Sequence, residues 1–271
     1  KIDLPAKHQD IVTAYNTEWD TANGQGWELK NFIELTKDRK SLYDVGGNIG
    51  FFSLVFGLNN NIDNKKRAYC FEPSPFGLST CVEILDHNDW FDRIKLFPLF
   101  VGDKEGVVEI LMEDTKTFVA LFEKPDENHG IIDNGGRSRG TMVTLDNFTW
   151  LAEMGIEGEK YSLDLVFEDK EKKVSHNYAG FEEEFYIDTI KIDVEGYEDN
   201  VLKGMSNFLN SNLHLYLKIE INRNFNNVEK ITSTINFIEK LNFKFFIIKD
   251  SKFINCNKSQ IINFLIYRNT D

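Results

Sequence analysis

The sequence predicts one α/β domain built on a doubly wound, mostly parallel β-sheet. From residue 42 onward, short apolar runs alternate with longer segments of helical periodicity, the pattern of parallel strands joined by covering helices. The first apolar run ends in a glycine-rich turn, residues 44–50, that opens directly into a helix. Because open sheets of this kind bind ligands outside the carboxyl ends of their strands, a ligand site is expected at this turn.

Each element follows from periodicity and from the turn residues that bound it. Apolar residues at helical spacing predict helices at 11–19, 27–36, 51–58, 76–85, 147–153, 198–209 and 228–241. Short apolar runs predict seven core strands at 42–45, 67–71, 94–101, 189–194, 214–221, 244–248 and 261–267, with further strands at 106–112, 142–145 and 161–167. No crossover helix separates the last two core strands, so they are expected to pair antiparallel at one edge.

The chain is expected to divide into an N-terminal helical segment, residues 1–40, and the core domain on which it packs, residues 41–271. Two stretches interrupt the regular pattern of the core. Residues 124–140 are rich in Gly, Asn and charge, which predicts a loop or a lid over the site. The dense charges of residues 154–186 predict an insertion outside the sheet. The first residue is Lys1 rather than Met, which is compatible with an additional domain N-terminal to it.

Composition excludes several classes of partner. The 271-residue chain has a net charge of −13 and a pI near 4.9, and it carries no block of Lys and Arg, so a nucleic-acid substrate is not expected. No apolar run is long enough to span a bilayer. The three cysteines form no metal-spaced pair, and their odd number favours a reducing, cytoplasmic location.

The glycine-rich turn reads Asp-Val-Gly-Gly-Asn-Ile-Gly and admits three interpretations. A dinucleotide fingerprint needs glycines at the first, third and sixth positions, a spacing that fails whether it is counted from Gly46 or from Gly47. The carboxylate of Asp44 would also repel a pyrophosphate, whereas it suits a ligand with an amino group and a sulfonium, S-adenosylmethionine. The third interpretation is that the glycines only let a helix pack closely on a strand.

Residues at other strand ends favour the methyl donor. Glu72 ends the second strand, where an acidic side chain accepts the hydroxyls of a ribose. Asp103 follows the third strand and is placed to border an adenine, although the same residues also suit a simple turn. The set expected to contact the cofactor is Asp44, Gly46, Gly47, Asn48, Gly50, Glu72, Pro73, Ser74, Val101, Gly102 and Asp103.

Charged residues near the ends of the later strands are the candidates for catalysis. Period two places Lys191 and Asp193 on one face of their strand, and Lys218 and Glu220 repeat this arrangement on the next. Such Lys–acid pairs either fix the register of a sheet or handle the proton of a methyl acceptor. The catalytic candidates are Lys191, Asp193, Glu195 and Asp146.

A metal ion is the alternative to a direct base. Asp146, Asp193 and Glu220 would offer oxygen ligands to Mg²⁺, but pairing with Lys also accounts for these carboxylates, so a site without metal is favoured. None of the five histidines has metal-ligand spacing. His214 begins its strand and therefore lies at the wrong end of the sheet for the site.

Four segments occur in the order found in FkbM-type methyltransferases, which the sequence resembles over about residues 28–270. They read Tyr-Asp-Val-Gly-Gly-Asn-Ile-Gly at 43–50, Phe-Glu-Pro-Ser at 71–74, Val-Thr-Leu-Asp at 143–146 and Ile-Lys-Ile-Asp-Val-Glu-Gly-Tyr-Glu at 190–198. The resemblance implies a class I methyltransferase (Rossmann-like) fold. It also implies methyl transfer to a hydroxyl oxygen of a sugar, a glycan or a related small molecule. The chain departs from the family pattern at Gly47, where Ala is usual, and in the insertion at 154–186.

Two alternatives to a glycan O-methyltransferase stay open: a lipid, peptide or nitrogen acceptor, and a non-catalytic cofactor-binding domain of a larger protein. Methylation of nucleobases is disfavoured, because the strand end reads Asp-Val-Glu-Gly at 193–196 rather than Asp-Pro-Pro-aromatic or Pro-Cys. The acceptor pocket is expected to be built from residues 19–27, 124–140 and 154–186.

Overall fold

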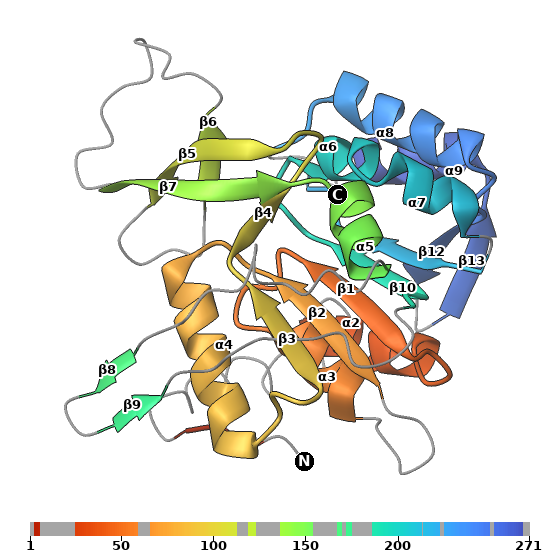
Figure 1. Cartoon of the computed structure of the whole chain (residues 1–271). Helices are drawn as coiled ribbons and strands as arrows, with labels where there is room; N and C mark the ends of the chain where they lie inside the picture. Colours follow the sequence, from red (N-terminus) through yellow and green to blue (C-terminus); the bar gives the residue numbers. More distant parts are fainter. Residues whose placement is uncertain are drawn as a thin grey trace.

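A five-stranded parallel sheet forms the centre of the molecule (Figure 1). The computed structural model describes residues 3–5, 25–58, 66–112, 119–122, 136–153, 167–169, 172–174, 186–212, 214–222, 225–249 and 252–267. The central strands are β1 Ser41–Val45, β2 Arg67–Phe71, β3 Ile94–Phe97, β10 Thr189–Ile192 and β11 Tyr216–Ile219, in the order β11-β10-β1-β2-β3. The chain runs outward from β1 to β3 and then resumes on the other side of β1, so the predicted doubly wound fold is confirmed.

Helices cover both faces of this sheet. One face packs against α2 Gln25–Leu35, α3 Phe51–Leu58 and α4 Pro75–Asn88. The other packs against α5 Leu145–Glu153, α6 Glu198–Lys203, α7 Ser206–Ser211 and α8 Val228–Lys240. Successive strand residues alternate between the two cores: Leu42 and Ala68 face α3, whereas Tyr43 and Tyr69 face α5. Buried residues on both faces explain why these strands read as continuous apolar runs.

The strand predicted at 94–101 is two strands that belong to different sheets. β3 ends at Phe97, and β4 Leu99–Val101 joins a second sheet with β5 Gly106–Met112, β6 Val119–Phe122 and β7 Gly136–Val143, in the order β4-β7-β5-β6. Pro98 stands between β3 and β4 and has no N–H to donate to a strand neighbour, which ends the central ladder there. The second sheet therefore begins beside the carboxyl end of β3.

The C-terminal prediction is partly wrong. β12 Phe245–Lys249 pairs antiparallel with β13 Lys252–Cys256, and the run at 261–267 lies in a helix, α9 Lys258–Tyr267. Periodicity alone does not separate a short buried strand from a buried helix. The decisive signal was the capping box in which Asn257 and Gln260 exchange side-chain to backbone hydrogen bonds of 3.0 and 2.9 Å. In the described residues the hairpin forms its own two-stranded sheet, so the central sheet has five strands rather than seven.

Other predicted elements differ in extent. The helix predicted at 198–209 is divided into α6 and α7 at Gly204, where an added Cβ would lie 1.8 Å from the carbonyl oxygen of Gly102. The helix predicted at 11–19 lies outside the described residues, as does most of the insertion at 154–186. Within that insertion, β8 Phe167–Asp169 and β9 Lys172–Val174 form a hairpin. No helix in the described ranges is both long and apolar enough to cross a bilayer.

Candidate active site

The candidate site lies where the strand order reverses. β1 has β2 on one side and β10 on the other, all parallel, so their carboxyl ends open at the same edge. Ligands of open α/β sheets bind at such switch points. A pocket occupies this edge, with about 740 Å³ of empty space that includes its open mouth.

The pocket collects residues from the ends of three central strands, β1, β2 and β10, and from β4 of the second sheet. Its lining is Val45, Gly46, Asn48, Phe71, Glu72, Pro73, Leu99, Phe100, Val101, Asp193, Val194, Glu195 and Tyr197. Seven of these were predicted from the sequence: Gly46, Asn48, Glu72, Pro73, Val101, Asp193 and Glu195. Among the described residues that line the pocket, three are acidic and none is Lys or Arg.

Most of the apolar lining was missed by sequence reasoning; of its members, only Pro73 and Val101 were predicted. Phe100 and Tyr197 belong to a small cluster with Met142 of β7, so this side of the pocket depends on the second sheet. Only the crossing of the chain at Pro98 brings Phe100 here, and Pro98 was the one available sequence signal for that crossing.

The glycines of the turn differ in role: one lines the pocket, and two allow close packing against neighbouring elements. Gly46 lines the pocket with a φ of 71°, and an added Cβ would lie 1.9 Å from the backbone oxygen of Asp193. Gly47 instead faces β2, where an added Cβ would lie 2.2 Å from the sulfur of Cys70, and Gly50 faces α4, where it would lie 2.4 Å from the sulfur of Cys81. The packing interpretation therefore applies to these last two, which are outside the described lining.

Glu72 is fixed in a ligand-accepting position by two backbone amides. Its carboxylate accepts hydrogen bonds of 2.7 Å each from the N–H groups of Asn48 and Ser74. Burial raises the pKa of Glu72, and these hydrogen bonds oppose that effect. Asn48 adopts a left-handed conformation with a φ of 52°, and its Oδ1 is buried with no hydrogen-bond partner among the described residues. Asn48 and Glu72 both line the pocket.

Beneath the pocket, Lys191 joins two loops. Its ammonium donates to the carbonyl oxygen of Gly46 at 2.9 Å and lies 3.3 Å from Asp193 Oδ2 and 3.6 Å from Asp44 Oδ1. Burial alone would lower the pKa of Lys191, but the charges of Asp44 and Asp193 outweigh it and raise the pKa well above its ordinary value. We therefore expect Lys191 to stay protonated, and it does not belong to the described lining of the pocket.

Asp44 supports the turn from below. It is fully buried, and its Oδ2 accepts from the N–H and the hydroxyl of Ser53 at 3.1 and 2.7 Å. It does not belong to the described lining of the pocket, so the structure places this predicted ligand contact one layer further in.

Glu195 lies in a strained turn that is held by hydrogen bonds with neighbouring residues. Its φ is 50°, unusual for a residue other than Gly, and Gly196 follows with a φ of 98°. Buried Glu198 accepts hydrogen bonds from the N–H of Gly196 at 2.8 Å and from the side chain of Asn226 at 3.1 Å, and Lys230 donates to the carbonyl of Gly196. The Asp193–Gly196 segment is thereby held in one conformation.

The environment of Glu195 gives it the pKa of a base that works near neutrality. Partial burial, followed by the charges of Asp193 and Glu220, raises the pKa of Glu195 to about 7. The side chain still reaches solvent at the pocket. General bases are most effective when their pKa lies near the working pH.

The remaining predicted residues have structural partners away from the described lining. Asp146 accepts from the N–H groups of Asn207 and Phe208 at 3.0 and 2.8 Å and so caps α7. Asp103 accepts from the side chain of Asn200, Gly102 donates to Val143, and Ser74 caps α4 by accepting from Gly77.

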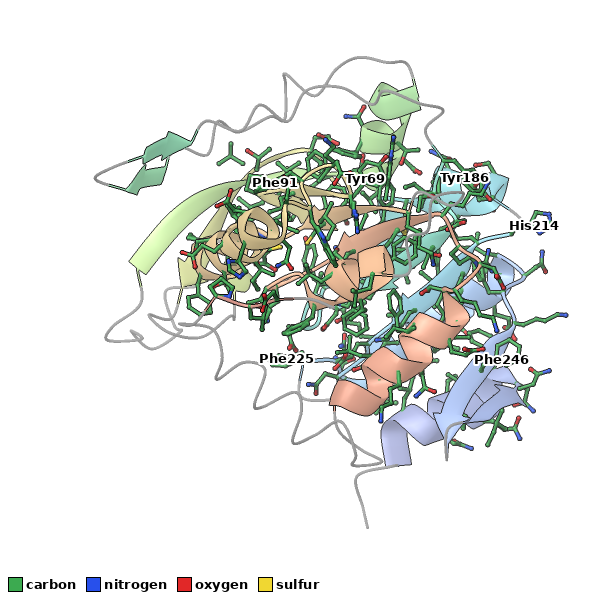
Figure 2. The ribbon with its side chains drawn as sticks, turned by 90° about the horizontal axis from the view of Figure 1, so that it is seen from below. Tyr69, Phe91, Tyr186, His214, Phe225 and Phe246 are labelled. Carbon is green, nitrogen blue, oxygen red and sulfur yellow. The ribbon has the colours of Figure 1, made fainter. Side chains whose placement is uncertain are left out.

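The alternative metal site is not assembled in the part of the chain that the structure describes. No group of three or more His, Cys, Asp or Glu residues there could hold a metal ion, so Asp146, Asp193 and Glu220 do not converge. Lys218 pairs with Glu28 rather than with the predicted Glu220. His214 and Phe225 lie at opposite ends of the sheet (Figure 2). Because Phe225 follows β11, His214 lies at the amino end of the strands, as the sequence indicated.

Replacing Gly46 by Ala should destabilise the fold and remove the pocket geometry. The added methyl meets the Asp193 backbone, and strain at positive φ alone costs about 1–3 kcal/mol. Urea unfolding measures the loss. Gly106→Ala is the matched control, because Gly106 also has a positive φ but nothing within 4 Å of an added Cβ. Equal losses for both variants would show that backbone strain, not the contact with Asp193, sets the cost.

Replacing Asp146 by Ala tests capping against catalysis. Loss of this cap should cost about 0.5–2 kcal/mol of unfolding free energy and leave ligand affinity unchanged. Asp92→Ala, at a side chain that is 78% exposed, serves as the control and should change little. If the Asp146→Ala protein kept full stability but lost turnover, Asp146 would instead be assigned a catalytic role.

Comparison with known proteins finds similar methyltransferase chains. The family model described as "Methyltransferase FkbM domain" matches residues 44–245. The chain is 26% identical over 174 residues to methyltransferase sdnD of Sordaria araneosa, a match that covers 60% of each chain, so it spans about 60% of that curated relative. A crystal structure of a methyltransferase FkbM from Methylobacillus flagellatus KT matches with a TM-score of 0.43 and 14% identity, over 93% of this chain and 59% of that one.

The family match covers well over half of the chain and contains both the glycine turn at Gly46 and the strand end at Asp193. The chain belongs to the FkbM methyltransferase domain family.

Proposed function

We propose that the chain is an S-adenosylmethionine-dependent O-methyltransferase that acts on a hydroxyl of a sugar, a glycan or a related small molecule. The observation that carries the proposal is the charge of the pocket, which has three acidic residues in its described lining and no Lys or Arg. A pyrophosphate or a phosphorylated nucleotide needs cations there, whereas a sulfonium with an amino group is attracted by carboxylates.

The polar and apolar parts of the pocket fit the methyl donor. The buried carboxylate of Glu72 is oriented to accept hydroxyl hydrogen bonds, and Asn48 lines the pocket beside it. Leu99, Phe100 and Val101 offer an apolar slot for an aromatic base. Asp44 and Lys191 act indirectly by fixing the turn.

The chain contributes orientation and one proton transfer to the reaction. S-adenosylmethionine, when bound, would supply a methyl group on a sulfonium. The acceptor oxygen would bond to the methyl carbon, the carbon–sulfur bond would break, and its electron pair would stay on sulfur. Glu195 takes the proton of the acceptor hydroxyl, because its pKa of about 7 leaves much of it ionised at neutral pH. Lys191 holds Asp193 and the Gly46 carbonyl in fixed positions, which favours an in-line approach.

Calorimetry with S-adenosylmethionine and with NAD tests the cofactor. The protein should bind the first and not the second. Glu72→Gln should weaken donor binding about 10- to 100-fold, since a hydrogen bond to a charged group contributes about 1.5–3 kcal/mol. Asp103→Asn, outside the described lining, should change affinity little. Tight binding of NAD without binding of the methyl donor would refute the proposal.

Replacing Glu195 by Gln tests the base. With an acceptor found by screening glycans against labelled donor, the wild-type rate should rise with pH through a midpoint near 7, because the base works only when deprotonated. Glu195→Gln should lose this limb and fall about 10²- to 10⁴-fold in rate. Asp193→Asn should move the midpoint to lower pH, since the Asp193 charge helps to raise the pKa of Glu195.

Glu229→Gln is the control for these variants, because Glu229 is an exposed acid in the first turn of α8. NMR titration of the Glu195 carboxyl gives its pKa without any acceptor. An unchanged pH limb in Glu195→Gln would remove this residue from the mechanism.

A further inference from the structure

Lys218 lies outside the pocket lining and forms a largely buried ion pair with a helix. It occupies β11, its side chain is 13% exposed, and it pairs with Glu28 of α2, which is 29% exposed. The pair joins the edge strand of the central sheet to α2, across the face that also carries α3. Burying the charges of Lys218 and Glu28 costs desolvation free energy, so surface solubility does not explain why they lie here.

The ammonium groups of two lysines flank one aromatic ring. Lys218 and Lys191 are register partners on β11 and β10, and their Nζ atoms lie 4.8 and 4.9 Å from the centroid of the Phe52 ring. Like charges on adjacent strands repel, but each lysine has its own carboxylate partner, and the ring face attracts both cations. The Phe52 ring is thereby held against the sheet by two charges.

Phe52 is the second residue of α3, directly after the glycine turn. Its neighbour Ser53 donates two hydrogen bonds to Asp44, and the N–H of Leu54 donates to the carbonyl of Gly50 at 2.8 Å. The Phe52 ring also packs against Phe32 of α2, with centroids 5.0 Å apart and the two rings at 85° to each other. The position of this ring therefore sets the first turn of α3 and the end of the glycine turn.

We propose that Lys218 is a positioning residue for the glycine turn, acting through Phe52, and that its pairing with Glu28 couples α2 to the affinity of the cofactor site. Lys191 holds the Gly46 end of the turn through a hydrogen bond to the Gly46 carbonyl. Lys218 restricts the Gly50 end through its contact with the Phe52 ring. The functional part of this inference rests on the proposed cofactor, whereas the mechanical part concerns the unliganded chain.

Lys218→Met removes the charge and keeps most of the side-chain length. In the unliganded protein, hydrogen exchange should become faster at the amides of residues 51–54, while those of β2 stay protected. Calorimetry with S-adenosylmethionine should show a dissociation constant about three- to tenfold higher, in line with the loss of one cation–π contact. Lys218→Arg, which keeps the charge, should recover most of the affinity. Phe52→Leu should weaken binding, and adding Lys218→Met to it should change little, because Phe52→Leu already removes the contact between Lys218 and the ring.

Lys37→Met is the matched control. Lys37 forms an exposed ion pair with Glu34 of α2, 2.6 Å long, so its loss should leave exchange and affinity unchanged. A Lys218→Met protein with a lower melting temperature but wild-type exchange at 51–54 and wild-type affinity would overturn the inference, since Lys218 would then be merely stabilising. If the wild-type chain does not bind the donor, the proposed function fails and the coupling to affinity fails with it. The exchange data still decide the mechanical part.

Discussion

The contact between Lys191 and its three oxygen partners determines the geometry of this site. An ammonium that is 2% exposed would be very costly without neighbouring charges. Asp44 on β1 and Asp193 after β10 supply those charges, and the Gly46 carbonyl accepts its hydrogen bond. Removing one partner of a buried pair costs about 3–5 kcal/mol, because the other charge is left uncompensated. The two strands that flank the switch point are therefore locked together where the pocket opens.

This arrangement leaves the pocket acidic. Lys191 lies outside the pocket lining, and its positive charge is balanced by Asp44 and Asp193. It therefore does little to neutralise the charges of Glu72 and Glu195. A ligand that enters must supply positive charge or offer hydrogen-bond donors. Partial burial, together with this excess of carboxylates, raises the pKa of Glu195, so under the proposed function one pocket would both select a cationic donor and prepare a base.

The sequence was sufficient where a residue's position follows from its place at a strand end. Glu72, Asp193 and Glu195 follow strands whose order could be inferred, and they line the pocket. It was insufficient where a side chain is used by a distant element. Asp146 caps α7 about sixty residues further along the chain, and Phe100 reaches the pocket only because the chain changes sheets at Pro98. Local patterns carry no information about such partners.

The repeated Lys-x-acid pattern of β10 and β11 shows why one motif can acquire two roles. Lys191 and Lys218 are register partners and face the same ring, yet their carboxylate partners differ. Lys191 lies at the switch point, where β1 can offer Asp44, whereas Lys218 lies on the edge strand and must find Glu28 on a helix. Placement in the sheet, rather than the motif itself, makes the first lysine a support beneath the pocket and the second a link to α2. The packing and ligand interpretations of the glycine turn are reconciled in the same way. Gly47 and Gly50 let the turn lie close against the elements beneath it, and that close fit presents Gly46 and Asn48 to the pocket.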